Sequence, residues 1–190
     1  MVGMWRGMQR PSGVENLMSD EMDEKKYSGA ALNTFVLGLT ESKSVVDKIL
    51  ADAGIEKIDP EAWYDFEWAE NFFIKVQEVL GTAVVNQCGK TMIESASYPP
   101  EIHSVETLLP ALGQWYSFHA RGPGVGTIVC EMEDETSATI AWSTGRFPCS
   151  FCRGILEGAC TRYGVKPLIE HGVGGCRDQG APTCIYHVSW

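Results

Sequence analysis

Hydrophobic residues recur at helical spacing through the first two thirds of the chain. Between residues 29 and 55 they form two stripes, separated by Ser42 and closed by Gly54. The stripes consist of Leu32, Phe35, Val36 and Leu39, then Val45, Val46, Ile49 and Leu50. Positions i, i+3, i+4 and i+7 share one face of a helix, so the pattern predicts two consecutive amphipathic helices.

Three further helices are expected before the pattern changes. Asp59 followed by Pro60 is typical of a helix start, with Asp as N-cap and Pro in the first turn. Six aromatic residues follow, and we interpret them as core, with the alternative that some line a ligand cavity: Trp63, Tyr64, Phe66, Trp68, Phe72 and Phe73. Residues 82–95 predict the next helix. After a break at 97–100, a helix starting near Pro110 is expected to run to His119.

Alternating strand patterns begin at Thr127. Residues 127–132 and 138–142 flank the acidic turn 133–135 and predict an antiparallel hairpin. A helix starting at Pro148 and closed by Gly164 follows, then short strands at 166–170 and 184–188. The expected fold is α+β, a helical N-terminal half packed on a small antiparallel sheet with a β-β-α-β-β C-terminal half.

The size and charge of the chain limit the number of domains and the kinds of partner that it can have. The 190 residues suit one ligand-binding domain over 27–190, with residues 1–26 as a disordered tail. A net charge of −10 argues against nucleic acid and anionic membrane surfaces as partners. No apolar run approaches the length of a membrane span. An odd number of cysteines, seven, without a secretory segment predicts a cytoplasmic location with thiols free or metal-bound.

Five of the seven cysteines follow Phe147 and give the clearest chemical signal. They are Cys149, Cys152, Cys160, Cys176 and Cys184. The first two form C-x2-C at a helix start, and the last two form C-x7-C around a loop with glycine and proline. Thiolates grouped in this way are typical ligands of a tetrahedral zinc ion. Cys160 is expected to be an ordinary core residue, since free cysteine packs as a small apolar side chain.

The chain from Gly29 to Trp190 resembles the superfamily of 4-vinyl-reductase domains, haem nitric-oxide-binding sensors and TRAPP transport subunits. The resemblance is carried by R-G-I-L-E-G-A at 153–159 and by C-x7-C followed by I-Y-H-V at 185–188. Within this superfamily, the chain is most similar to the 4-vinyl-reductase-like sensor domains of aromatic-responsive activators. That resemblance implies a zinc ion bound by Cys149, Cys176, Cys184 and an acidic residue.

The fourth ligand is left open by the sequence. In the family the acid lies close before the first cysteine of the late pair, whereas here 171–175 separates Glu170 from Cys176. Glu170 and Cys152 rank equally as candidates, and His171 ranks below them.

The expected function is a small-molecule-binding sensor or carrier domain with a structural zinc and an apolar pocket. The pocket candidates are Trp115, Phe118, His119 and Trp142. Its ligand is expected to be small and apolar or aromatic, and a homodimer is expected. The alternative from another class is an interaction subunit related to the transport-complex subunits. No hydrolase, nucleotide-binding or metalloprotease motif is present, so an enzyme is not expected.

A haem-based gas sensor is the less favoured alternative. The haem-binding branch of the superfamily carries an axial histidine on a helix and a Y-x-S-x-R motif for the haem propionates. His103 and His119 are the histidine candidates, but the stretch from Tyr116 to His119 lacks the arginine. The sequence therefore predicts a protein that does not hold haem.

Overall fold

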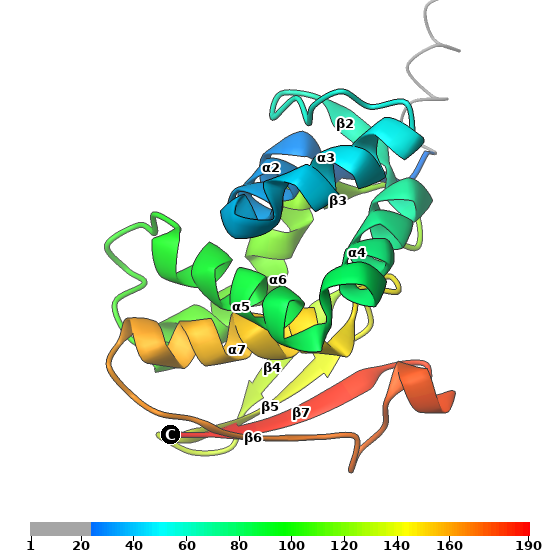
Figure 1. The fold of residues 1–190 in the computed structure, drawn as a ribbon. Helices are drawn as coiled ribbons and strands as arrows, with labels where there is room; N and C mark the ends of the chain where they lie inside the picture. The colour runs from blue at the N-terminus through cyan, green and yellow to red at the C-terminus, as the bar shows by residue number, and fades with distance from the viewer. Residues whose placement is uncertain (1–23) are drawn as a thin grey trace, which may run out of the picture.

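A computed structural model describes residues 24–190 and has the predicted α+β architecture (Figure 1). The helices are α2 (Gly29–Leu37), α3 (Lys43–Asp52), α4 (Phe66–Leu80), α5 (Thr82–Ser95), α6 (Val105–His119) and α7 (Cys149–Arg162), with short 3-10 helices η1 (Thr40–Ser42) and η2 (Arg177–Gln179). The strands are β1 (Lys26–Ser28), β2 (Trp63–Asp65), β3 (Ala120–Arg121), β4 (Ile128–Met132), β5 (Ser137–Trp142), β6 (Leu168–His171) and β7 (Cys184–Ser189). No described helix is long and apolar enough to cross a membrane. Most of the expected tail at 1–26 lies outside the described residues.

The larger sheet is antiparallel throughout, with strand order β4-β5-β7-β6. Alternate residues of β5 and β7 turn toward the helices, because successive side chains of a strand point to opposite faces. Ile140 pairs with Tyr186 at the centre of the sheet, and both side chains are fully buried. Helix α7 lies across the inner face of this sheet, and α5 lies on the far side of α7 (Figure 1). The predicted hairpin and both later strands are confirmed, with bounds that agree to within two residues.

Helices α5 and α7 approach each other closely through three glycines. A Cβ atom on Gly154 would lie 2.0 Å from the backbone oxygen of Asn86, and one on Gly158 would lie 2.6 Å from that of Lys90. From the other side, a Cβ on Gly89 would lie 2.4 Å from the backbone oxygen of Phe151. Gly154 and Gly158 therefore form the surface through which α7 packs on α5.

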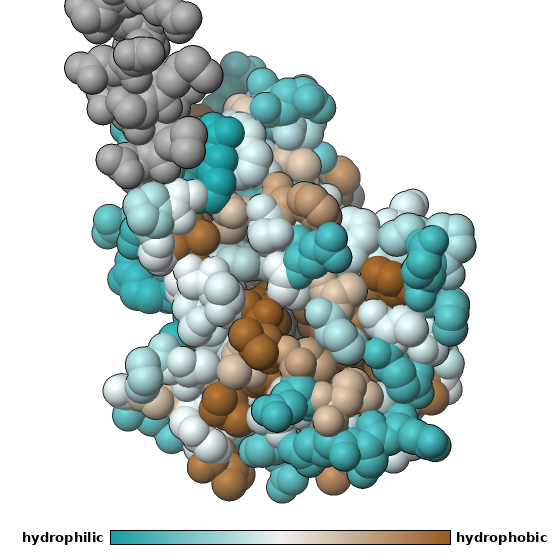
Figure 2. Space-filling model, turned by 180° about the vertical axis from the view of Figure 1, so that it is seen from behind, coloured by the Kyte–Doolittle hydropathy of each residue, from teal (hydrophilic) through white to brown (hydrophobic). Residues whose placement is uncertain are grey.

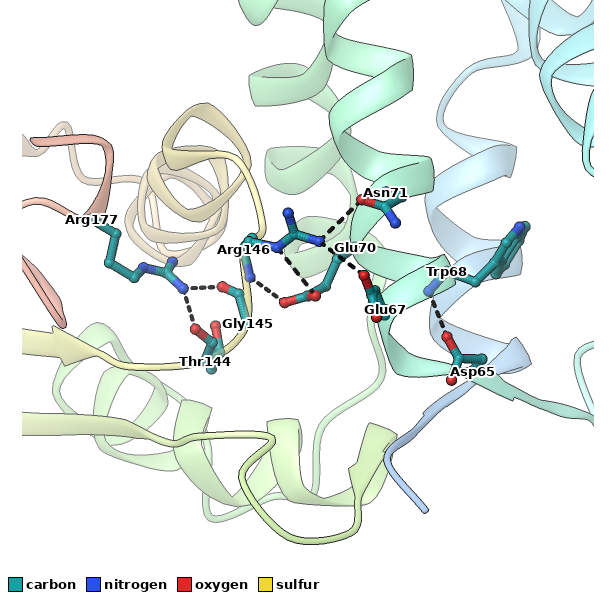
Figure 3. Close-up of polar contacts among 9 residues, drawn as sticks. All are labelled: Asp65, Glu67, Trp68, Glu70, Asn71, Thr144, Gly145, Arg146 and Arg177. Atoms are coloured by element: carbon teal, nitrogen blue, oxygen red, sulfur yellow. Dashed lines mark hydrogen bonds and ion pairs between the residues drawn. The ribbon is translucent and has the colours of Figure 1, made fainter. Parts of the chain in front are cut away.

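A second sheet, with order β2-β1-β3, was not predicted. Its strands have two or three residues, too few to show alternation, and β1 pairs with distant partners. The helix start predicted at Asp59 is wrong, because Asp59 instead forms a turn in which its carboxylate accepts from the Glu61 N–H. Helix α4 begins at Phe66, where Asp65 caps it by accepting from the Trp68 N–H at 2.8 Å (Figure 3).

Helix α6 also begins earlier than predicted. It starts at Val105, and Pro110 lies inside it. Ser104 and Thr107 form a capping box in which threonine takes the place of the usual Glu or Gln, with the Ser104 N–H donating to Thr107 Oγ1 at 3.0 Å. The hydroxyl of threonine thus supplies the start signal that was assigned to the proline.

The aromatic residues of α4 form the centre of the core, as interpreted from the sequence. The ring of Phe73 lies 4.1 Å from that of Phe35 on α2 and 4.8 Å from that of Phe151 on α7. Phe147, just before α7, lies 5.0 Å from Phe73. This cluster joins the helical half to α7 and bounds one side of the pocket described next.

Candidate ligand pocket and cysteine cluster

A cavity of about 200 Å³ lies between the helical half and the sheet. Its walls come from α2, the end of α5, α6, β4, β5 and α7. The lining residues are Tyr27, Ala30, Ala31, Thr34, Met92, Ile93, Ala96, Tyr98, Leu112, Trp115, Tyr116, His119, Ile128, Trp142, Thr144, Phe147, Phe151 and Ile155. None of them is Lys, Arg, Asp or Glu, so the wall that the described residues provide is almost wholly apolar and aromatic. Figure 2 shows hydrophobic residues around a hollow on the face opposite to the view of Figure 1.

Some polar groups of the pocket wall already have partners. The Tyr116 hydroxyl donates to the Val125 carbonyl at 2.6 Å, and the Thr34 hydroxyl donates to the Ala30 carbonyl at 2.9 Å. Thr144 differs from these, because it is 3% exposed and its hydroxyl has no hydrogen-bond partner among the described residues. A buried hydroxyl without a partner loses its hydration without compensation, so it marks a place where a ligand group would fit.

His119 lies on the same wall, at the end of α6. Its Nδ1 lies 2.7 Å from the hydroxyl of Ser28, the residue that caps α2. Burial lowers the pKa of His119, which favours the neutral imidazole. Because Nδ1 is held by Ser28, Nε2 is the ring nitrogen left for other partners.

Three of the four predicted pocket residues line the cavity, namely Trp115, His119 and Trp142. Phe118 does not, because its position on α6 turns the ring outward, where it is 58% exposed. Sequence reasoning missed Thr144, whose small side chain gives no periodic signal. His103, the other histidine considered, is exposed before α6 and is not part of the lining.

A second cluster of chemical groups lies where four elements begin or end. Cys149 opens α7, His171 ends β6, Cys176 precedes η2, and Cys184 opens β7. One ligand atom from each of these residues lies within 4.8 Å of the others. The Cys149 sulfur is 3.8 Å from that of Cys176 and 3.7 Å from that of Cys184. These separations match the edge of a tetrahedron with metal–sulfur bonds of about 2.3 Å.

Arg177 controls the electrostatics of this cysteine cluster. Its backbone N–H and its Nε each lie 3.4 Å from the Cys184 sulfur. Burial alone would raise the pKa of Cys184, but these hydrogen bonds and the guanidinium charge lower it overall. Burial, and after it the neighbouring Asp178 and Cys184, raise the pKa of Cys149. Cys184 therefore ionises more readily than Cys149.

Two of the predicted metal ligands lie outside the cysteine cluster. Glu170 is exposed on the outer face of β6, while the adjacent His171 turns inward and stacks on Tyr186 with 4.2 Å between ring centres. Alternation along the strand therefore brings the lower-ranked His171 to the cysteines and takes Glu170 away. Cys152 lies one turn into α7, fully buried, and is not one of the four residues brought together.

The segment from Thr144 to Arg146 lies between Arg177, which binds the Cys184 sulfur, and Glu70 (Figure 3). Arg177 Nη1 donates to the carbonyls of Thr144 and Gly145. On the other side, the Arg146 N–H donates to the carboxylate of Glu70, which is only 7% exposed. A Cβ on Gly145 would overlap that carboxylate and the Phe66 ring, so any other residue would force these buried side chains to move. These contacts hold the backbone beside the pocket in place.

No family model and no curated protein matches the sequence, but the fold matches solved structures of H-NOX domains. One from a study of haem distortion in the H-NOX family has a TM-score of 0.69 at 17% identity, covering 86% of this chain and 94% of that one. An Fe(II) H-NOX protein from S. oneidensis has a TM-score of 0.66 at 17% identity, covering 85% and 95%. An oxygen-binding H-NOX domain related to soluble guanylate cyclases has a TM-score of 0.63 at 18% identity, covering 85% and 92%. The chain therefore has the H-NOX fold.

The prediction of zinc as the cofactor is contradicted by these neighbours, which are haem-binding domains rather than zinc proteins. The sequence signal was ambiguous because cysteine spacing shows which thiols meet and does not show which cofactor a fold carries. The resemblance to the superfamily that includes the haem sensors holds at the level of fold. The closer likeness to 4-vinyl-reductase domains gains no direct support from the neighbours.

In the described part of the chain, the pocket lining offers an axial histidine for haem but no cation for the haem propionates. His119 offers a neutral imidazole on an apolar wall, as an axial ligand requires. The propionate motif was sought on α6, but its spacing recurs as Trp142-x-Thr144-x-Arg146. Trp142 lacks the tyrosine hydroxyl. The Arg146 guanidinium lies 3.6 Å from the Glu70 carboxylate and 3.1 Å from Asn71, outside the lining (Figure 3). The described lining thus has no cation for a propionate.

Proposed function

We propose that this chain is a small-molecule-binding sensor domain whose ligand occupies the pocket between α6, α7 and the sheet. The observation that carries the proposal is the cavity of about 200 Å³ with an aromatic wall and one unpartnered buried hydroxyl. Ligand sites are typically concave and mostly apolar, with a few polar groups that fix orientation. The H-NOX fold of solved sensor domains supports the same assignment.

A pocket-filling variant tests the proposal. Ala31 is 5% exposed on the pocket wall, so Ala31→Leu would place its side chain in the cavity. Ala51→Leu makes the same change on the exposed side of α3 and serves as the matched control. Thermal unfolding is measured with phenols, fatty acids and tetrapyrroles. A ligand at a hundredfold excess over its dissociation constant stabilises by about 2.7 kcal/mol.

That gain corresponds to a rise in Tm of about 5 to 11 °C for a protein of this size. We expect at least one class to stabilise the unmodified protein and the Ala51→Leu protein, and to lose its effect in Ala31→Leu. Equal ligand effects in all three proteins would show that the cavity is not the binding site.

A haem-based sensor is a second candidate, favoured by the contact between His119 and Ser28. A histidine that binds a metal usually has its other ring nitrogen fixed by a hydrogen bond, as Nδ1 is here at 2.7 Å. Reconstitution with hemin tests this candidate. A Soret band that survives gel filtration, disappears in His119→Ala and remains in His103→Ala would support it. Hemin that elutes separately from the protein would reject it.

We also propose a metal ion at the cysteine cluster, with Cys149, Cys176 and Cys184 as sulfur ligands and His171 as the nitrogen ligand. The mutual distances within 4.8 Å and the tetrahedral sulfur spacing support the site. Such an ion would tie the start of α7 to β6 and β7. Elemental analysis of the purified protein measures both its identity and its stoichiometry.

The remaining sequence predictions continue as parts of this proposal. They are a single ligand-binding domain over 27–190, a 4-vinyl-reductase-like assignment, a cytoplasmic location and a homodimer. The interaction-subunit alternative differs from the sensor proposal because it requires a large contact with another subunit. Ligand exchange separates the two, because a sensor pocket takes up added aromatic ligands, whereas a sealed cavity with a large apolar contact face is expected for an interaction subunit.

A further inference from the structure

We propose that the pocket takes an uncharged ligand of one or two fused rings whose single hydrogen-bonding group meets the Thr144 hydroxyl. This inference rests on the proposed function and names the class of ligand. Three observations carry it, namely the size of the cavity, the absence of charge from its described lining, and the fixed position of Thr144.

The cavity size limits the ligand to a small ring system. An apolar cavity of about 150 Å³ holds one benzene molecule. The cavity here, about 200 Å³, therefore has room for one ring with substituents or for two fused rings. A porphyrin has four pyrrole rings and needs several times this space. To accept it, α6 would have to separate from the sheet, although Leu108, Leu109 and Ile140 are fully buried between them.

The lining also disfavours a charged ligand. Removing a carboxylate from water without a cation is costly, and the described lining contains neither Lys nor Arg. The two nearby arginines bind other groups, although Arg177 Nη2 is buried without a partner among the described residues. Arg146 pairs with Glu70, and Arg177 donates to Cys184 and to backbone carbonyls. An uncharged ligand avoids this penalty.

Thr144 is the recognition point because its backbone is held from both directions. Its own carbonyl and that of Gly145 accept hydrogen bonds from Arg177, and the next N–H along the chain donates to Glu70 (Figure 3). Thr144 is thus held among the lining residues before a ligand arrives, so little of the entropy cost of ordering the residue falls on binding. Since a hydroxyl both donates and accepts, it matches a ligand hydroxyl, carbonyl or ring N–H.

A matched pair of probes tests this inference. 2-Naphthol and naphthalene share one ring system, and only 2-naphthol has a hydroxyl. Their dissociation constants are measured by isothermal titration calorimetry with the unmodified protein, Thr144→Val and Thr144→Ser. Thr34→Val is the control, because Thr34 lies on the same wall but its hydroxyl is bonded to Ala30. One hydrogen bond predicts about a threefold to tenfold preference for 2-naphthol.

The preference should persist in Thr34→Val and Thr144→Ser and disappear in Thr144→Val. A preference that survives in Thr144→Val overturns the inference while leaving the pocket as a ligand site. Stoichiometric hemin binding that depends on His119 would overturn the limits that this inference sets on the size and charge of the ligand. It would leave the sensor proposal intact. If neither naphthalene nor 2-naphthol binds, this inference fails, and the proposed function fails as well only if phenols, fatty acids and tetrapyrroles all leave the protein unstabilised. Should Thr144→Val not fold, nuclear Overhauser contacts between 2-naphthol and the Thr144 methyl group in the unmodified protein decide.

Discussion

Replacing Gly154 by alanine tests the close approach of α5 and α7 most directly. The new Cβ would lie 2.0 Å from the backbone oxygen of Asn86, more than 1 Å inside ordinary contact. Because the opposing atom belongs to the backbone, a side-chain rotation cannot relieve the overlap, and one helix must move. Moving α7 would disturb Phe151 on the pocket wall and Cys149 in the cysteine cluster.

Two opposing effects set the magnitude for Gly154→Ala. Alanine favours a helix over glycine by about 1 kcal/mol, which would stabilise the variant if α7 were free. Overpacking a well-filled contact costs about 1 to 3 kcal/mol and sometimes more. For a backbone contact as short as 2.0 Å we take the upper part of that range, so the expected net loss is about 1 to 2 kcal/mol. The corresponding fall in Tm is about 2 to 8 °C.

Gly158→Ala provides a graded comparison on the same helix. Its Cβ would lie 2.6 Å from the Lys90 backbone oxygen, so the helices must separate less and the loss should be smaller. Urea unfolding followed by circular dichroism gives both free energies. If both variants gain about 1 kcal/mol, as helix propensity alone requires, α5 and α7 do not touch in the way described here. Equal losses would contradict the grading by distance.

Three further outcomes are expected. Cys184→Ser should lose bound metal by elemental analysis while Cys160→Ala, buried on α7, keeps it; retention in Cys184→Ser would contradict the metal site. Because burial holds the pKa of His119 below its ordinary 6.5, the unfolded chain takes up a proton first as pH falls. The contribution of neutral His119 to the free energy of unfolding is therefore full above about pH 6.5 and declines below it. His119→Asn should make the Tm less pH-dependent between about pH 7.5 and 5.5. An unchanged dependence of Tm on pH would contradict the lowered pKa. Trp115→Ala should weaken 2-naphthol binding in calorimetry, and Phe118→Ala should not, since only Trp115 lines the cavity; equal effects would contradict the assignment of the lining.

Much of the fold was predictable because its main elements have strong local signals. The hairpin of β4 and β5 shows strand alternation around an acidic turn, and α7 lies between a proline and a glycine that closes it. The small sheet was not predictable, because β1 has three residues and pairs with partners far along the chain. The start of α6 was missed because Thr107 caps it through a hydroxyl, in a position where Glu or Gln is usual.

The candidate site was predictable only in part, for a similar reason. Cysteine spacing at a helix start and around a loop, together with the family resemblance, pointed to Cys149, Cys176 and Cys184, but it also offered Cys152, which lies outside the cluster. His171 required knowledge of which face of β6 it occupies. The pair of Ser28 and His119 is separated by 91 positions, and such a contact leaves no local pattern.

The bridge made by Arg177 means that the pocket and the cysteine cluster are not independent parts. One side chain holds the Cys184 sulfur and the carbonyl of Thr144. Substitutions within one hydrogen-bond network do not have additive effects, so the double variant Cys184→Ser/Arg177→Lys should differ from the sum of its single variants. A loss of pocket-ligand affinity in a cysteine variant therefore reports the disturbed Arg177 contacts as well as the missing cysteine sulfur. Metal content and pocket binding need to be measured together on every variant of either site.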